Sequence, residues 1–221
     1  MFKCILCLNG VLPNKSVIVR LLNQYKSAEL IAVDGAANQL LKKGLIPRYV
    51  MGDFDSFEYD DRISSENLIL LKDQNSTDFE KSLSVIKKRK LYPVLVLGVN
   101  GGELDHVIDN IHKFVKYSAE IPMVMYDYVG SKQAKWGAVI NKQLDCKLPR
   151  GSTVSVFPYH ANTHLESDGL KWELNGNTHG IFDFTSTRNV TIKEQSALKA
   201  DQDKTLLIVE SNACPFIFEP L

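Results

Sequence analysis

Two kinds of hydrophobic pattern divide this chain of 221 residues. In about the first 130 residues, short apolar runs alternate with stretches whose apolar side chains recur every three or four positions. The short runs predict strands at residues 3–8, 30–33, 49–51, 68–71, 94–97 and 123–126. Such alternation of strands and helices is typical of a parallel sheet covered by helices.

Four helices are expected between these strands. The first lies around residues 17–22 and the second at residues 36–43. The third begins at Thr77, where the sequence T-D-F-E is a capping box whose fourth member is Glu80. The fourth begins near Leu104, and its apolar residues recur on one face.

The pattern changes beyond about residue 130. From residue 135 onward no long amphipathic helix is predicted, and short apolar runs are separated by Gly, Asn and Asp. These runs predict strands at residues 153–159, 169–175, 180–184, 189–193 and 205–210. We therefore expect an α/β chain with a Rossmann-like parallel sheet with helices on both faces in residues 1–132. An antiparallel β-sandwich is expected in residues 133–221.

Composition excludes some classes of protein. The 26 basic side chains balance 26 acidic ones, so no net positive field is available for general nucleic-acid binding. The longest apolar run, at residues 93–99, is far shorter than the roughly 20 residues that cross a bilayer. The N-terminus does not resemble a signal peptide, so we expect a cytoplasmic protein without a nucleic-acid or membrane partner.

Four cysteines are too few for a disulfide scaffold at this length. Cys4 and Cys7 have the C-x-x-C spacing of redox and zinc sites. They fall in a predicted buried strand, however, where a spacing of three directs the two side chains to opposite faces. We interpret both as buried strand cysteines.

Aspartates follow several predicted strands, at the edge of the sheet where ligands bind in this class of fold. The candidate residues are Asp34, Asp53, Asp55, Asp78 and Asp105. Any one of them can be an ordinary helix cap. Because an aspartate occurs at several strand ends, a shared site is favoured over separate helix caps. Carboxylates that cluster in this way require a cation if all are to stay ionised.

Mg²⁺ is the cation that this pattern favours, because it prefers a few carboxylates together with waters and phosphate oxygens. Asp53 and Asp55 are two residues apart in what we expect to be an extended segment, so their side chains should converge on one ion. Asp78 and Asp105 each fall in the first turn of a predicted helix, where the helix dipole favours the ionised form.

A glycine-rich turn is the second candidate element. Gly101 and Gly102 lie between a predicted buried strand and a helix, which resembles a phosphate-cradling turn, although the sequence matches neither the dinucleotide-binding nor the Walker motif. Lys81 lies one turn into the third helix and could reach a phosphate oxygen, or be an ordinary solvated lysine. His106 and Asn110 share one helix face, where we favour hydrogen bonding or core packing over metal binding.

The second half of the chain contributes an aromatic residue beside small polar ones. These are Trp172 in the segment G-L-K-W, and Ser186 and Asn189 in S-T-R-N. An aromatic ring can stack on a flat cationic heterocycle while hydroxyl and amide groups bind its edge. A core tryptophan is the alternative reading.

In this order, the segments VDGAAN, GDFDS, DQNSTDFEK, LGVNGGELDH, GLKWEL and STRN resemble the thiamin pyrophosphokinase (thiamine diphosphokinase) family. The resemblance extends from Asp34 to about Asn189. It implies an ATP-binding α/β domain, a β-sandwich that helps to bind thiamine, and a homodimer with sites between subunits. The implied reaction transfers the pyrophosphoryl group of ATP to the hydroxyl of thiamine and releases AMP.

The resemblance also assigns roles to individual residues. It implies catalytic roles for Asp53, Asp55, Asp78 and Asp105, of which the first three would bind Mg²⁺. The residues expected to bind ATP or thiamine are Asp34, Thr77, Lys81, Gly101, Gly102, Trp172, Ser186 and Asn189.

Two positions depart from the family pattern. Glu103 stands where members usually carry Arg, and Arg188 stands where they usually carry Ser. We expect Glu103 to point away from the site and cap its helix, while Lys81, Lys132 or Arg188 supplies the missing charge.

Two alternative functions remain open. One is a related pyrophosphokinase acting on a pterin alcohol, and the other is a catalytically silent nucleotide- or thiamine-binding module.

Overall fold

A computed structural model of the protein describes residues 1–128, 133–140, 143–146, 148–212 and 214–215. The chain divides into two compact units. Unit 1 comprises Met1–Phe114 and Ile121–Met123, and unit 2 comprises Val115–Glu120 and Val124–Leu221. The domain boundary predicted between residues 132 and 133 falls at the edge of residues 129–132, which lie outside the described part.

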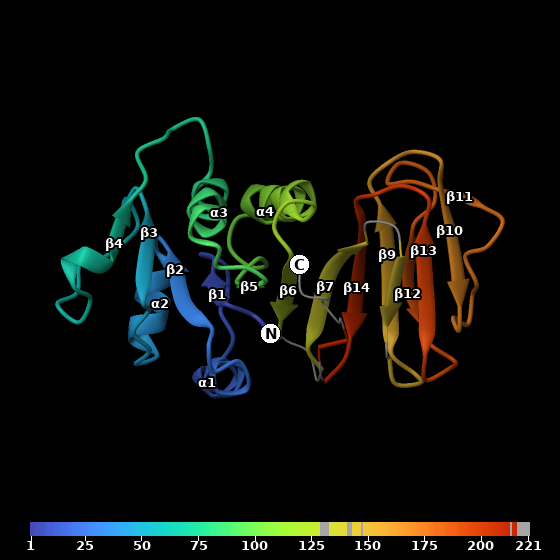
Figure 1. Ribbon diagram of the computed structural model, residues 1–221, viewed down its shortest axis with the longest axis horizontal. Helices are drawn as coiled ribbons and strands as arrows, with labels where there is room; N and C mark the ends of the chain where they lie inside the picture. The colour runs from blue at the N-terminus through green and yellow to red at the C-terminus, as the bar shows by residue number, and fades with distance from the viewer. Residues whose placement is uncertain (129–132, 141–142, 147, 213, 216–221) are drawn as a thin grey trace. The chain divides into compact units, whose positions relative to one another are not determined.

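Unit 1 contains a parallel sheet, as predicted (Figure 1). Its strands lie in the order β5 (Val94–Leu97), β1 (Cys4–Cys7), β2 (Glu29–Val33), β3 (Tyr49–Gly52) and β4 (Leu68–Leu70). Every residue of β1 and of β5 is buried, because helices cover both faces of the sheet.

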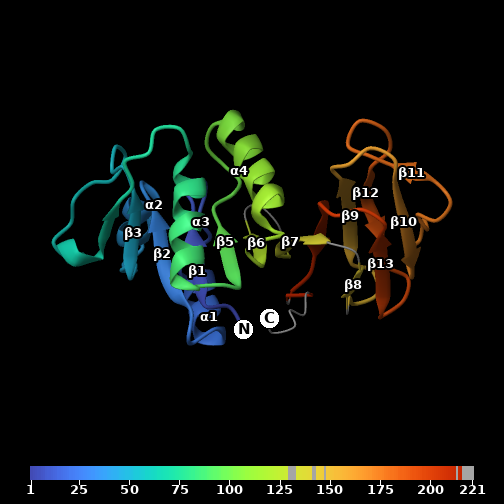
Figure 2. The same cartoon turned by 45° about the horizontal axis from the view of Figure 1, so that its top comes forward.

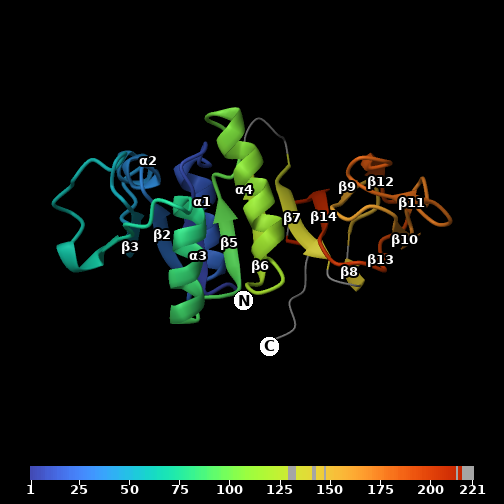
Figure 3. The ribbon, with the colours of Figure 1, turned by 90° about the horizontal axis from the view of Figure 1, so that it is seen from above.

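The helices of unit 1 confirm the predicted positions. They are α1 (Lys15–Gln24), α2 (Ala36–Lys42), α3 (Asp78–Arg89) and α4 (Leu104–Tyr117), with a short 3₁₀ helix, η1 (Ser65–Asn67). Figure 3 shows α1 and α2 on one face of the sheet and α3 on the other. Strands β2, β3 and β4 extend the sheet on one side of β1, whereas β5 lies on the other side. In this class of fold ligands bind at such a change of direction, so a crevice is expected at the carboxyl ends of β1 and β5.

The two cysteines of β1 are buried strand residues, which confirms that interpretation. Burial raises the pKa of the Cys7 thiol to about 12 and also raises that of Cys4. Neither thiol is therefore a nucleophile at neutral pH in the folded protein.

Unit 2 consists of antiparallel strands in two sheets (Figure 2). In the larger sheet, which has ten strands in all, five neighbouring strands have the order β12 (Ser186–Val190), β9 (Thr153–Pro158), β14 (Thr205–Glu210), β7 (Lys135–Ile140) and β6 (Met123–Asp127). The other has the order β11 (Thr178–His179), β10 (Thr163–Asp168), β13 (Ser196–Ala200) and β8 (Gln143–Cys146). Buried and more exposed positions alternate along β9 and β10, so each sheet packs through one face.

Two of the strands predicted in unit 2 are wrong. Residues 169–175 form a turn because the Glu173 carboxylate accepts hydrogen bonds from the backbone N–H groups of Gly169 (2.9 Å) and Leu170 (3.1 Å), and from the Ser167 hydroxyl. Residues 180–184 also turn, with backbone hydrogen bonds that join Gly180 to Asp183 and to Phe184. In the described ranges, no helix has both the length and the apolar character needed to cross a membrane.

Candidate functional site

A cavity of about 330 Å³ lies at the carboxyl edge of the parallel sheet in unit 1. Its lining comes from the segments after β1, β2, β3 and β5 and from the beginnings of α3 and α4. The polar and glycine residues that line it include Asn9, Gly10, Asp34, Asp53, Gln74, Thr77, Asp78, Lys81, Gly101, Gly102, Glu103, His106 and Asn110. The crevice expected from the strand order is therefore present and strongly polar.

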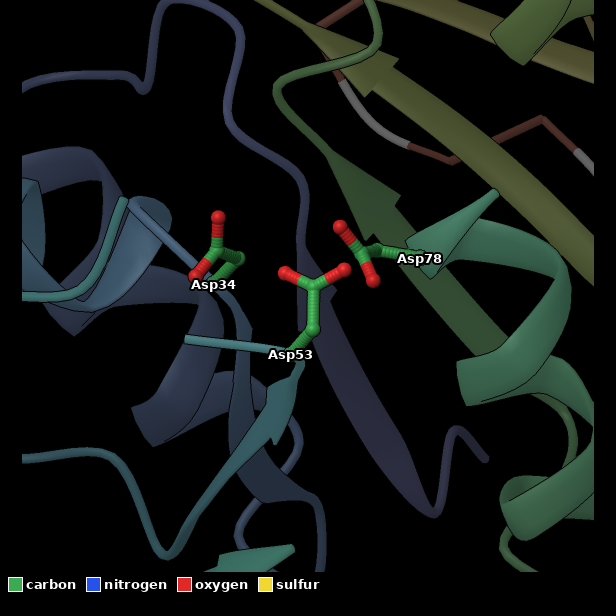
Figure 4. A group of neighbouring side chains, drawn as sticks. All are labelled: Asp34, Asp53 and Asp78. Carbon is green, nitrogen blue, oxygen red and sulfur yellow. The ribbon is translucent and has the colours of Figure 1, made fainter. Parts of the chain in front are cut away.

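Three carboxylates gather in this cavity (Figure 4). Asp34 follows β2, Asp53 follows β3, and Asp78 is the first residue of α3. Each offers one oxygen, and these oxygens all lie within 4.8 Å of one another. Three carboxylates at this separation repel one another unless cations or protons lie among them.

Asp34 is held in a constrained backbone conformation. It is a non-glycine residue with φ of +45°, and its N–H donates to the carbonyl of Met51 on the neighbouring strand at 2.9 Å. Asp34 is only 6% exposed. Its Oδ2 accepts a hydrogen bond from the N–H of Ser56 at 3.3 Å, whereas its Oδ1 is buried without a hydrogen-bond partner in the described part of the chain. Burial raises the pKa of Asp34, and the charge of Asp78 adds to this, while the Ser56 hydrogen bond opposes it.

Lys81 is buried against the same carboxylates, so the solvated-lysine alternative is wrong. Its ammonium lies 2.6 Å from Asp78 Oδ1 and 3.3 Å from Asp53 Oδ2, and it donates to the Leu71 carbonyl at 3.3 Å. Burial alone would lower the pKa of Lys81, but the two carboxylates outweigh burial and raise it.

The same contacts act on Asp53. Burial would raise the pKa of Asp53, but hydrogen bonds from the Asp55 backbone and from Lys81 outweigh it and lower the pKa. Asp53 is therefore ionised at neutral pH, beside a charged lysine.

Asp55 does not converge with Asp53, which corrects the geometry expected from their spacing. Phe54 has φ of +69°, so the segment turns where an extended conformation was expected. The Asp55 side chain is exposed and is absent from the three-carboxylate group, and its N–H donates to Asp53 Oδ1 at 3.4 Å.

Asp105 also lies apart from the carboxylate group. It is exposed in the first turn of α4, where its Oδ1 accepts a hydrogen bond from the N–H of His106 at 2.8 Å. His106 and Asn110 line the cavity from the same helix, and His106 is exposed, which excludes core packing for it.

The glycine turn lies where it was predicted. Gly101 and Gly102 have φ of +88° and +93° and line the cavity. A Cβ on Gly101 would lie 2.3 Å from Val11 Cγ2, so the turn requires glycine on both conformational and steric grounds. Thr77 caps α3, and its side chain accepts from the N–H of Glu80 at 3.5 Å, which confirms the predicted helix start.

Glu103 is exposed at the rim of the cavity and directly precedes α4, where its backbone carbonyl accepts a hydrogen bond from the N–H of Val107 at 3.1 Å, and the outward direction expected for its side chain stays a prediction. Of the three compensating cations considered, Lys81 lies in the cavity, Lys132 is outside the described residues, and Arg188 is in unit 2.

Sequence reasoning missed the segment after β1. Asn9 and Gly10 line the cavity, and Gly10 accepts a hydrogen bond from the Gln39 side chain at 2.8 Å. A Cβ on Gly10 would lie 2.3 Å from the carbonyl oxygen of Gly98. The Asn-Gly pair directly after a buried strand was the signal that could have identified this element.

In unit 2, the predicted aromatic and polar residues are in contact. Asn189 is buried, and its amide donates to the carbonyl of Trp172 at 2.7 Å and to the Ser186 hydroxyl at 3.4 Å. Its Oδ1 accepts from the N–H of Trp172 at 3.2 Å. The Trp172 indole is 56% exposed, which excludes the core reading, and the ammonium of Lys171 lies 4.5 Å from its ring centre.

Arg188 occupies a bulge on β12. It has φ of +54° at the shift in register between Ser186 and Asn189, and its guanidinium lies 3.2 Å from Glu210. An arginine is accommodated here because its side chain points into solvent with an ion-pair partner.

Two family models match the chain, one after the other. Residues 21–125 match "Thiamin pyrophosphokinase, catalytic domain", and residues 139–206 match "Thiamin pyrophosphokinase, vitamin B1 binding domain". The chain belongs to the thiamin pyrophosphokinase family. The first match contains the three-carboxylate group, and the second contains Trp172, Ser186 and Asn189.

Individual relatives are consistent with this family. The chain is 24% identical to thiamin pyrophosphokinase 1 of Caenorhabditis elegans over 185 residues, which cover 79% of this chain and 76% of the relative. It is 28% identical to thiamine pyrophosphokinase of Bacillus subtilis over 155 residues, which cover 66% and 70% of the two chains.

Solved structures of the family share the fold. The thiamine pyrophosphokinase structure from Bacillus subtilis has a TM-score of 0.74 at 21% identity, covering 96% of this chain and 99% of the other. Thiamin pyrophosphokinase from Candida albicans also gives 0.74, at 17% identity, covering 95% and 89%.

Proposed function

We propose that this chain transfers the pyrophosphoryl group of ATP to the hydroxyl of thiamine, giving thiamine diphosphate and AMP, with the triphosphate bound in the unit 1 cavity. The reaction is that of the family to which the chain belongs. The observation that carries the assignment to this cavity is the convergence of Asp34, Asp53 and Asp78 beside a glycine turn.

The donor atoms fit a magnesium ion. All three gathered side chains offer carboxylate oxygens, which are ligands that Mg²⁺ prefers. Asp34 Oδ1 is buried without a hydrogen-bond partner, an arrangement that costs about 1–3 kcal/mol unless a ligand satisfies the atom. When bound, Mg²⁺ neutralises charge on the triphosphate oxygens.

The remaining cavity residues are suited to a polyanion. Gly10, Gly101 and Gly102 allow a close approach of phosphate to the backbone, because they carry no side chain over the turn. Lys81 contributes a fixed positive charge. Attack at the β-phosphorus requires the alcohol and the leaving AMP to be aligned, and positioning with charge stabilisation supplies most of the catalysis in phosphoryl transfer.

Thiamine recognition is assigned to the Trp172 segment of unit 2. Its indole is exposed and has the ammonium of Lys171 over its ring, which supports the proposal that this surface attracts a cationic ring. Asn189 holds the Trp172 backbone with its buried amide, and Ser186 supports that amide. A flat cationic ring such as thiazolium suits this surface.

Two further parts of the proposal concern assembly and location. We expect a homodimer, supported by the exposed aromatic side chains of unit 2, of which Phe182 is 95% exposed. Sedimentation equilibrium tests this expectation. A cytoplasmic location is expected from the sequence alone, and fractionation with an antibody tests it.

The decisive experiment measures AMP and thiamine diphosphate released from ATP, with thiamine or a hydroxymethyl pterin as acceptor. Release of both products with thiamine alone supports the proposal, whereas turnover of the pterin supports the alternative pyrophosphokinase. Binding of either substrate without turnover identifies a silent module.

A variant pair ties the activity to the cavity. Asp53→Asn should lower kcat by roughly 10²-fold or more, the scale expected when charge stabilisation is lost. The exposed Asp61→Asn is the matched control and should retain wild-type turnover. Near wild-type kcat in Asp53→Asn at saturating magnesium would contradict the site assignment.

A further inference from the structure

Lys81 has the features of an internal counter-ion. Its side chain is only 5% exposed, which is unusual for lysine. An ammonium has three N–H donors, and three acceptors surround this one: Asp78 Oδ1, Asp53 Oδ2 and the Leu71 carbonyl. The contacts with Asp53 and Leu71 are hydrogen bonds, and the contact with Asp78 is an ion pair, so the ammonium is held entirely by protein atoms.

The position of this ammonium overlaps the position that a metal would require. Asp53 and Asp78 are two of the three residues whose oxygens lie within 4.8 Å of one another. Both form ion pairs with Lys81, while Asp34, whose Oδ1 is buried without a hydrogen-bond partner among the described residues, forms none there. One ammonium thus offsets one of the two negative charges of Asp53 and Asp78, and the cluster of three carboxylates keeps negative charge for another cation.

We propose that Lys81 is a positioning residue that holds the place of the metal between Asp53 and Asp78 in the ligand-free protein, and that the metal must compete with it. This inference rests on the proposed function, because it takes the carboxylate cluster to be the metal site. It assigns to the lysine two opposing effects: it keeps the carboxylates together before the metal binds, and it weakens the binding of the free metal.

The test uses Mn²⁺ alone, without nucleotide, because its free ion is quantified by electron paramagnetic resonance. Lys81→Met preserves much of the apolar stem and removes the charge. Mn²⁺ should bind this variant roughly ten-fold or more tightly than wild type, the lower end of the effect of one unit charge a few ångströms from a dication. Lys88→Met, on an exposed position of the same helix, is the matched control and should leave Mn²⁺ binding unchanged.

Thermal unfolding gives a second measurement. Without metal, Lys81→Met should unfold at a lower temperature than wild type, because Asp53 and Asp78 lose their counter-charge. Saturating Mg²⁺ should then raise the unfolding temperature of the variant by more than it raises that of wild type. If Lys81→Met does not fold, the double variant with Asp53→Asn removes one charge of each sign and should restore folding.

The outcomes separate the inference from the proposed function. Loss of Mn²⁺ binding in Asp53→Asn together with unchanged or weaker binding in Lys81→Met overturns the role of Lys81 and leaves the metal site standing. Such a result is expected of a lysine that serves only phosphate. Mn²⁺ binding by wild type that Asp53→Asn does not affect overturns the metal site itself. A double variant that remains unfolded also overturns the counter-ion role.

Discussion

Asn189→Ala tests whether one buried amide holds together the Trp172 segment of unit 2, to which we assign thiamine recognition. The wild-type side chain is 1% exposed and takes part in hydrogen bonds with both backbone groups of Trp172. It also accepts from the N–H of Val190 at 2.8 Å and donates to the Ser186 hydroxyl. Alanine lacks the amide oxygen and nitrogen that make these hydrogen bonds, so the backbone groups of Trp172 and Val190 and the Ser186 hydroxyl remain but lose this partner.

The magnitude follows from the backbone groups left without partners. Each buried donor or acceptor that loses its hydrogen bond costs about 1–3 kcal/mol. The segment around Trp172 is half-exposed, so water can reach part of it, and we expect a loss of about 2–4 kcal/mol in the free energy of unfolding. At a slope of about 2 kcal/mol per molar urea, the midpoint should fall by about 1–2 M.

Tryptophan fluorescence is a suitable assay because the two tryptophans of the chain, Trp136 and Trp172, both lie in unit 2. Urea titration with excitation of tryptophan therefore reports on that unit. Thr187→Ala, at an exposed position of the same strand, is the control and should unfold near the wild-type midpoint. A midpoint for Asn189→Ala within experimental error of wild type would refute the reasoning that these hydrogen bonds are energetically important.

Three further predictions concern ligands and pH. Trp172→Ala should weaken thiamine binding by about 1–3 kcal/mol and leave ATP binding nearly unchanged, as measured by calorimetry on each ligand; equal losses for both would contradict the stacking role. Glu103→Arg should lower KM for MgATP by roughly 3–10-fold at fixed ionic strength, because it replaces an anion lining the cavity by a guanidinium; a rise in KM would show that Glu103 makes a favourable contact. Burial lowers the pKa of His179 in the folded protein, so at pH values below the ordinary histidine pKa of about 6.5 the unfolded chain binds more protons than the folded one. The free energy of unfolding should therefore fall as pH is lowered through that value, and it should fall less in His179→Gln. An equal fall in both proteins would exclude His179 as the cause.

The fold of unit 1 could be predicted because each local signal agrees with the final structure. The apolar runs of β1 and β5 are buried on both faces, and the Thr77 cap starts α3 where the sequence indicated. Unit 2 was harder to predict, since β10 has the sequence THLESD, in which Leu165 is the one apolar residue and polar residues lie on both faces. The turn at residues 169–175 depends on Glu173, whose partners lie up to six residues away and are not evident from hydrophobicity.

The sequence predicted which residue types form the candidate site better than it predicted how their side chains are arranged. The fold brings Asp34, Asp53 and Asp78 together, as their positions at the ends of two strands and at the start of a helix indicated. The expected convergence of Asp55 with Asp53 is wrong because Phe54 between them has a left-handed backbone conformation, which the sequence does not indicate for a non-glycine residue. Burial of Lys81 likewise depends on the Leu71 carbonyl and two carboxylates that only the folded chain brings into contact.

The central strand β1 carries two buried thiols whose chemical labelling can report on unit 1. Cys4 and Cys7 pair on one side with β2 and on the other with β5, and both are 0% exposed. A thiol reagent can reach them only when that strand leaves the sheet, so their alkylation rate, mapped by mass spectrometry of the N-terminal peptide, measures opening of unit 1. Combined with tryptophan emission from the other half, such labelling can follow the two units separately in one sample and show whether each ligand stabilises one unit or both.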